Sequence, residues 1–184
     1  MFDVSRLSLS LAAVLMPLLG CGGTTTQTHP QGEQVLLAKG EVAAAPNGIG
    51  FPYKYKNWPV LSVNQRPDTQ SISVVVGNLE AVRAARKGQT NPWPDGTVIG
   101  HLVFEPSELR GTPSAVESGM LVRAEFMFKD VEAYAGNSSG WGWARWDGEQ
   151  LAPYGEKGFE EECIECHTKV SGTDWLFSKP VELP

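Results

Sequence analysis

The pattern of hydrophobic and polar residues after residue 70 predicts several β-strands. Residues 70–76 are rich in β-branched side chains, which favour a strand. Residues 97–104 are apolar on both faces, as in a strand at the centre of a sheet. Residues 120–128 alternate more clearly: Phe126 belongs to an apolar face and Glu125 to a more polar one. We therefore expect three strands here.

A fourth strand is predicted over residues 141–146, with its three tryptophans on one face. Residues 79–87 instead have apolar residues at helical spacing and predict a short helix. The composition of residues 92–96 predicts a tight turn. Four or more strands with hairpin-length connections and few helices predict an α+β, mainly β fold: an antiparallel sheet with a few short helices.

The N-terminal residues lack this patterning. Residues 7–19 are apolar but too few to span a bilayer as a helix, so residues 1–20 are expected to be a signal peptide. Their end, Leu18–Cys21, resembles a bacterial lipobox. The resemblance implies cleavage before Cys21, lipidation of its thiol and a lipoprotein on the periplasmic side of a bacterial membrane, the outer one in a Gram-negative host. Ordinary secretion with a free Cys21 is the alternative.

Residues 21–49 are rich in Gly, Thr, Gln, Pro and Ala and contain few bulky apolar side chains. Such a segment buries too little surface to offset the entropy lost on ordering, so we expect a flexible tether. His29 lies in this tether and is expected to be solvated. The folded domain is predicted to span residues 50–184.

Charge narrows the function classes. The 184 residues include 21 acidic and 15 basic side chains, and the net charge of −6 argues against a nucleic-acid-binding protein. The chain has three cysteines and three histidines. Two of the cysteines and one histidine lie together near the C-terminus, as Cys163-Ile164-Glu165-Cys166-His167.

This C-x-x-C-H spacing is typical of c-type haem attachment. Two thiols bond the two vinyl groups of one porphyrin, and the next residue's imidazole reaches the iron from the same side. A thioredoxin-like motif does not need His167, a disulfide leaves it unexplained, and a zinc site needs four ligands. The motif occurs once, so we expect one covalent haem, held by Cys163 and Cys166 with His167 as axial ligand. The acidic residues before it predict that a short helix begins there and carries the motif.

The place of the motif argues against a small helical electron carrier. Most such cytochromes have C-x-x-C-H near the N-terminus and a methionine downstream as sixth ligand. Here 17 residues follow His167, and none is Met or His.

The chain resembles the cytochrome P-460 family, which includes the cytochromes c′-beta, over roughly Tyr53 to Phe177. The resemblance rests on the order and spacing of several short segments. These are Tyr55-Lys56-Asn57-Trp58, residues 72–87, Pro94-Asp95-Gly96-Thr97-Val98, Phe128-Lys129-Asp130, Gly140-Trp141-Gly142-Trp143, the haem motif and Asp174-Trp175-Leu176-Phe177. It implies a mostly antiparallel β domain with one covalent haem. It further implies a five-coordinate iron, a homodimer, and reaction with hydroxylamine or nitric oxide.

The resemblance also implies roles for single residues. Cys163 and Cys166 match the thioether positions and His167 the proximal ligand. Glu125 matches a distal carboxylate that transfers protons. A lysine that crosslinks to the porphyrin edge in the P-460 type has no counterpart, because the strand reads Ile99-Gly100-His101 there. The crosslink that is characteristic of hydroxylamine-oxidising members is therefore not carried over.

Alternatives remain open for the distal residues. His101 is a core histidine bonded to a backbone carbonyl, a hydrogen-bond donor to a bound ligand, the sixth iron ligand, or a site of an unusual crosslink. Glu125 is either a solvated or salt-bridged strand residue, or a buried carboxyl whose pKa is raised by desolvation so that it donates a proton. Arg145 either pairs with a haem propionate or lies at the surface. The aromatic residues are expected in the core, with one or two lining the haem: Phe126, Phe128, Trp141, Trp143 and Trp146.

These observations favour an exported cytochrome with one haem c and an open distal site for nitric oxide or hydroxylamine. His101 and Glu125 are its candidate proton-transfer residues. An electron carrier with His101 as sixth ligand, and a nitric oxide-binding protein without turnover, are the alternatives. We expect a small nitrogenous ligand, a periplasmic electron partner of unknown identity, and contact with the membrane through the lipid only.

Overall fold

The computed structural model describes residues 25–28, 34–37 and 41–181. The chain divides into two compact units, Met1–Glu41 and Val42–Pro184. In the first unit, strands β1 (Thr25–Thr28) and β2 (Gln34–Leu37) pair in antiparallel register. The expected signal peptide, Cys21 and His29 lie outside the described residues.

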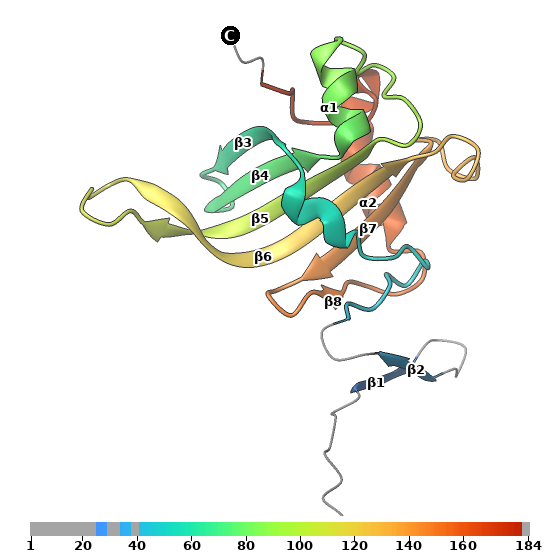
Figure 1. The fold of residues 1–184 in the computed structure, drawn as a ribbon, viewed down its shortest axis with the longest axis horizontal. Helices are drawn as coiled ribbons and strands as arrows, with labels where there is room; N and C mark the ends of the chain where they lie inside the picture. Colours follow the sequence, from blue (N-terminus) through green and yellow to red (C-terminus); the bar gives the residue numbers. More distant parts are fainter. Residues whose placement is uncertain (1–24, 29–33, 38–40, 182–184) are drawn as a thin grey trace, which may run out of the picture. The chain divides into compact units, whose positions relative to one another are not determined.

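The second unit contains a six-stranded antiparallel sheet in which each strand pairs with the next along the chain (Figure 1). Its strands are β3 (Val60–Arg66), β4 (Ser71–Gly77), β5 (Val98–Glu108), β6 (Val116–Lys129), β7 (Trp141–Asp147) and β8 (Ala152–Pro153). The helices are α1 (Leu79–Arg86) and α2 (Glu160–His167), with 3-10 turns η1 (Tyr53–Asn57) and η2 (Thr168–Thr173). The predicted α+β, mainly β fold is therefore confirmed.

The predicted elements match β4, α1, β5, β6 and β7. As its two apolar faces indicated, β5 lies inside the sheet, between β4 and β6. Helix α1 begins after Asn78, whose side chain accepts a hydrogen bond from the Ala81 amide at 2.9 Å. Within the described residues, no helix combines the length and hydrophobicity needed to cross a bilayer.

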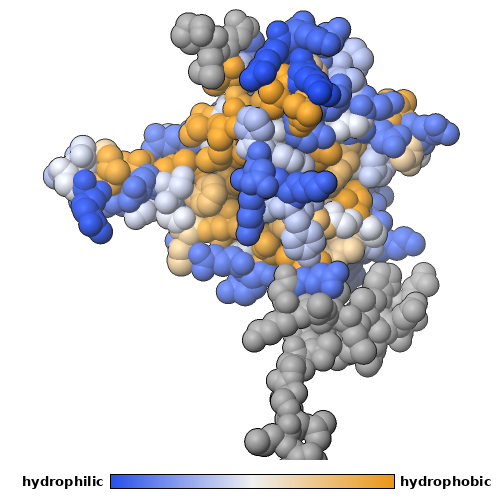
Figure 2. Space-filling model, in the orientation of Figure 1, coloured by the Kyte–Doolittle hydropathy of each residue, from blue (hydrophilic) through white to orange (hydrophobic). Residues whose placement is uncertain are grey.

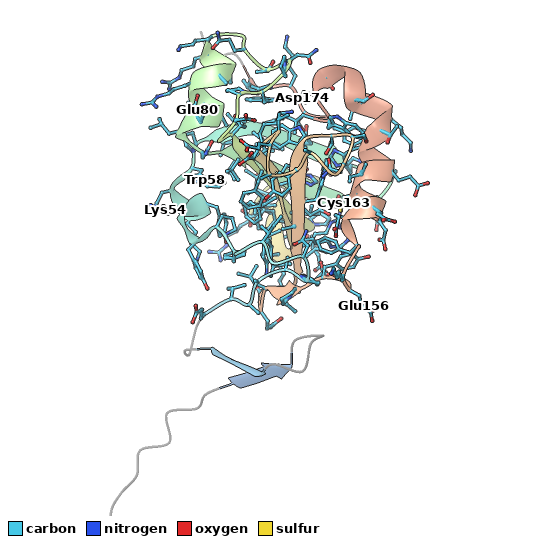
Figure 3. All side chains as sticks on the ribbon, turned by 90° about the vertical axis from the view of Figure 1, so that its right-hand side faces the viewer. Lys54, Trp58, Glu80, Glu156, Cys163 and Asp174 are labelled. Atoms are coloured by element: carbon cyan, nitrogen blue, oxygen red, sulfur yellow. The ribbon has the colours of Figure 1, made fainter. Side chains whose placement is uncertain are left out.

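Each face of the sheet buries its own core, because successive residues of a strand point to opposite sides. One core contains Val75, Ile99, Met127 and Trp143 and packs against α1 and α2. The other contains Val76, Leu102, Ala124 and Phe126 and packs against residues before β3. Figure 3 shows η1 and α2 on opposite sides of the sheet.

The three tryptophans of β7 do not share a face, contrary to the expectation. Trp141 and Trp143 belong to the core beneath the helices, whereas Trp146 belongs to the other core. Trp143 and Trp146 are an odd number of positions apart, so the alternation of the strand sends them to opposite sides. Both cores thus gain a buried aromatic anchor.

Part of the segment expected to be a tether packs on the sheet. The second unit begins at Val42 rather than Gly50, and Ala45 is buried. The Trp146 indole N–H donates to the Ala43 carbonyl at 2.8 Å, and the Asn47 amide donates to the Trp143 carbonyl, also at 2.8 Å. The first contact uses a backbone carbonyl of this segment and the second uses the side-chain amide of Asn47, so main chain and side chain together hold it on the sheet.

Candidate functional site

A cavity of about 320 Å³ lies between the sheet face that carries Trp143 and helix α2. Its walls come from β3 to β7, from α2 and from the segment after η2. This volume falls within the range of roughly 300–1,000 Å³ that is usual for small-molecule and cofactor sites. His101, Glu125, Cys163, Cys166 and His167 all line it. The five folded-domain residues singled out from the sequence are therefore brought together.

The sheet side of the cavity is built from two cross-strand rows. In antiparallel strands, residues directly opposite each other share a face. Ile99, Met127 and Trp143 pair in one row and make it apolar. His101, Glu125 and Arg145 pair in the next row and make it polar. Pairing register thus places a charged stripe beside a hydrophobic one.

Glu125 is held between two nitrogen donors. His101 Nδ1 lies 2.8 Å from Glu125 Oε2, and Arg123 Nε lies 2.9 Å from Glu125 Oε1. Burial alone would raise the pKa of Glu125, but the hydrogen bond from His101 and the positive charge of Arg123 outweigh it and lower the pKa to about 2. Glu125 is therefore an ionised carboxylate at neutral pH. This rules against the expectation that burial makes it a proton donor.

The ionised carboxylate also determines the tautomer of His101. A carboxylate only accepts hydrogen bonds, so Nδ1 of His101 must carry the proton that it shares with Glu125. Nε2 of His101 takes no part in this hydrogen bond. In the neutral ring it has a lone pair, and in the protonated ring it is a second donor.

Helix α2 supplies the other side of the cavity. Cys163, Cys166 and His167 stand three and four positions apart, a spacing that brings side chains to one face of a helix. Figure 3 shows Cys163 on the side of α2 that faces the sheet. Phe159, which directly precedes α2, is buried and packs edge-on against Tyr154, with ring centroids 6.0 Å apart. This contact anchors the start of the helix on the end of the sheet.

His167 is oriented by three neighbours. Its Nδ1 lies 2.6 Å from the Trp175 carbonyl oxygen, which only accepts, so Nδ1 donates and Nε2 is free. The rings of Trp143 and Phe177 meet it edge-on, with centroids at 4.7 Å and 4.8 Å. Desolvation lowers the pKa of His167, which favours the neutral imidazole that coordinates metal.

The two thiols differ in environment. Burial, with a smaller contribution from the charge of Glu125, raises the pKa of Cys163 to about 11. Cys166 is exposed. Redox-active C-x-x-C pairs have lowered thiol pKa values, so Cys163 does not match a thioredoxin-like site. Within the described ranges, no group of three or more His, Cys, Asp or Glu side chains could hold a metal ion.

The residues present fit a c-type haem. Two thiols and an imidazole with a free Nε2 stand on one helix, facing the apolar row of the sheet. Three arginines line the cavity and suit the carboxylates of a porphyrin: Arg66, Arg123 and Arg145. Arg145 lies over the Tyr154 ring at 3.8 Å and pairs with Asp147 at 2.7 Å, so it is held at the cavity wall rather than free at the surface.

Of the five aromatic residues considered from the sequence, Phe126 and Trp143 line the cavity and the other three do not. Four participants were missed: Arg66, Arg123, the Trp175 carbonyl and Phe177. Arg123 could have been found, because it stands two positions before Glu125 on the same strand face. The Trp175 carbonyl carries no signal in the sequence, since every residue has one.

Comparison with known proteins agrees with this geometry. A sequence comparison with curated proteins gave no significant match. The family model described as Cytochrome P460 matches residues 52–178, which include the whole sheet and the α2 motif. That match spans more than half of the chain, and the resemblance inferred from its motifs is thereby confirmed. The chain belongs to the cytochrome P460 family of haem-binding cytochromes.

Proposed function

We propose that this protein is an exported cytochrome with one covalent haem c, which binds or redox-transforms a small nitrogen species such as hydroxylamine or nitric oxide. The observation that carries the proposal is the His101–Glu125 pair in the cavity wall opposite the motif helix. A plain electron carrier has no need of a charged, hydrogen-bonded pair beside its haem. A site that handles protons does.

Cys163 and Cys166 would form the two thioether bonds, and His167 Nε2 would bind the iron. When bound, the haem supplies one-electron redox chemistry and an iron that takes small ligands. The apolar row formed by Ile99, Met127 and Trp143 limits the entry of water beside it. Arg66 and Arg123 would meet the propionates.

His101, rather than Glu125, is the proton-transferring residue in this proposal. Because Glu125 stays ionised, it accepts the hydrogen bond from His101 Nδ1 and holds that proton there. Nε2 of His101 is then the atom that gives up or takes a proton at a ligand in the cavity. Arg123 holds the carboxylate from the other side, so the ring keeps one orientation.

A second candidate is electron transfer with His101 as sixth ligand. It is favoured by one observation: His101 and His167 each bind a protein acceptor through Nδ1 and leave Nε2 free. Strand β5 contains no lysine, so the lysine crosslink of hydroxylamine-oxidising relatives has no counterpart on this strand. Nitric oxide binding without turnover is the third candidate.

The test is the optical spectrum of the ferrous, haem-loaded protein before and after addition of nitric oxide. A five-coordinate spectrum that changes with nitric oxide supports the proposal. A six-coordinate spectrum that is indifferent to nitric oxide favours His101 as ligand and electron transfer. A strongly red-shifted Soret band indicates a crosslinked haem. Turnover of hydroxylamine with a one-electron acceptor then separates catalysis from binding alone.

Export and assembly belong to the same proposal. We propose lipidation at Cys21, which mass spectrometry of the membrane fraction tests, with Cys21→Ser as control.

We also propose a homodimer. Hydrophobic surface is visible on the face of the sheet that carries η1 (Figure 2), and Val60 and Val63 of β3 are more than half exposed. Light scattering of the chain without its first 21 residues decides between monomer and dimer.

A further inference from the structure

A buried ion pair lies outside the cavity and has no role in the proposed chemistry. Lys129 Nζ and Asp174 Oδ1 are 2.8 Å apart, and their side chains are 4% and 8% exposed. The Trp93 backbone amide donates to Asp174 Oδ2 at 2.7 Å. The Trp141 indole N–H lies 3.4 Å from Oδ1, and the same ring lies 5.0 Å from Lys129 Nζ. Every polar atom of the carboxylate is therefore occupied.

Stability alone does not explain such a pair. Desolvating two charges costs about as much as their attraction returns, and apolar residues of similar volume often stabilise a core equally well. The pair is better explained by the geometry it imposes. It ties Asp174, in the segment after η2, to the end of β6 and to the loop before β5.

The backbone at this point is unusual. Asp174 has φ 49° and ψ 46°, and Trp175 has φ 69°, so two successive residues adopt the left-handed region. Aspartate tolerates this region, whereas a bulky residue such as tryptophan rarely enters it. A conformation of this kind persists only where surrounding contacts hold it. The contacts of Asp174 help to hold it, together with the hydrogen bond that the Trp175 amide donates to the Val170 carbonyl at 3.1 Å.

This reversal of the chain delivers two groups to His167. The carbonyl of Trp175 accepts the Nδ1 hydrogen bond at 2.6 Å. The ring of Phe177, two residues later, lies 4.8 Å from the imidazole. Neither Lys129 nor Asp174 lines the cavity.

We propose that Asp174, with its charge balanced by Lys129, is a positioning residue for the axial histidine: it holds the Trp175 carbonyl and the Phe177 ring against His167. The inference rests on the proposed role of His167 and goes beyond it. A hydrogen bond to the second nitrogen of a ligating histidine fixes the ring and raises its basicity. Asp174 thereby affects the strength of the iron–histidine bond without contacting the iron or His167.

The test compares two double variants of the haem-loaded full chain, Lys129→Met/Asp174→Ala and Lys129→Met/Asp174→Asn. Both are uncharged, so neither leaves a buried charge unpaired. Only asparagine keeps an oxygen for the Trp93 amide and tolerates the left-handed backbone. The readouts are the iron–histidine stretching band in resonance Raman spectra of the ferrous protein and the reduction potential.

We expect the alanine variant to show a band that is broadened and shifted to lower frequency, with a raised potential. The asparagine variant should keep both close to the wild type. Val82→Ala is the matched control for lost stability. Val82 lies in the same core as Trp93 and Trp141, and its replacement should leave the iron–histidine band unchanged. An alanine variant with the wild-type band and potential overturns the inference.

A second measurement needs no substitution. In the wild-type protein, the Trp93 amide proton and the His167 Nδ1 proton should exchange with solvent through one opening, with the same dependence on denaturant. Unrelated dependences overturn the inference. His167→Ala separates the two proposals: if it leaves the band unchanged, the ligand assignment itself fails. If His167→Ala removes the band but the Asp174 variants do not move it, the positioning role alone fails.

Discussion

His101 Nδ1 and Glu125 Oε2 lie 2.8 Å apart on neighbouring strands, at positions that face each other directly in the β5–β6 register. The pair is an imidazole on an ionised carboxylate, with Arg123 on the carboxylate's second oxygen. Such an arrangement fixes which nitrogen of the ring carries the shared proton. It leaves Nε2 of His101 outside this hydrogen bond.

If this pair transfers protons, His101→Gln and Glu125→Gln should each lower kcat for hydroxylamine oxidation by about 10²-fold, the lower end of what general acid–base catalysis contributes. Because the two residues act as one unit, the double variant should lose little more than either single variant. Steady-state kinetics with a one-electron acceptor measures this. Glu105→Gln, on the exposed part of β5 outside the cavity, is the matched control. Additive losses in the double variant would contradict a joint role.

Acidification should weaken the fold through Glu125. Its pKa is lowered from an ordinary 4.5 to about 2, so on acidification the unfolded chain takes up this proton first. The stabilisation is complete above pH 4.5 and is lost as the pH falls toward 2. The free energy of unfolding, measured with urea between these pH values, should fall less steeply on acidification in Glu125→Gln than in the wild type.

Asp68 provides the control for this pH dependence. Its hydrogen bond with Arg66 lowers its pKa to about 2 as well, but the pair is exposed at the surface. Exposed pairs contribute little to stability. In Asp68→Asn, the free energy of unfolding should therefore fall with pH nearly as steeply as in the wild type. If both variants reduce this pH dependence equally, Glu125 has no special role.

Haem retention and axial ligation should separate on mutation. The proposed thioether bonds to Cys163 and Cys166 do not involve His167, so His167→Ala should keep the haem in the intact mass after acid–acetone extraction while the axial-ligand bands change. Replacing both cysteines by alanine should release the haem under the same extraction. Loss of haem from His167→Ala would count against the two-thioether assignment.

Gly100→Ala should destabilise the domain by about 1–3 kcal/mol, the usual cost of overpacking a core. A Cβ at this central-strand position would lie 2.7 Å from Phe126 Cε1 and 3.0 Å from Val76 Cγ2, both in the buried core. Gly50→Ala is the control, since a Cβ there meets nothing within 4 Å. Denaturant unfolding gives the free energy of unfolding of both variants. Equal values would contradict the prediction and show that the core accommodates the added methyl group.

The sequence by itself determined what depends on near neighbours along the chain. β-Branched residues located β4, a run that is apolar on both faces located β5, and alternation located β6. Helical spacing located α1, and the spacing of Cys163, Cys166 and His167 predicted a haem motif. These features are local because a strand or helix repeats over a few residues. The same reasoning misplaced Trp146 only because the strand's period was not followed to its end.

Tertiary structure decided how these pieces meet. Glu125 stands 24 positions from His101, and Asp174 stands 45 from Lys129, so neither pairing follows from any local pattern. Burial alone predicted a raised pKa for Glu125, and only the register that brings His101 and Arg123 to it reversed the direction. The Trp175 carbonyl belongs to the site because the backbone reverses at Asp174 and Trp175, and residues far away in the sequence stabilise that reversal. Electrostatic environment depends on which groups are near in space, and a chain's local pattern does not contain that information.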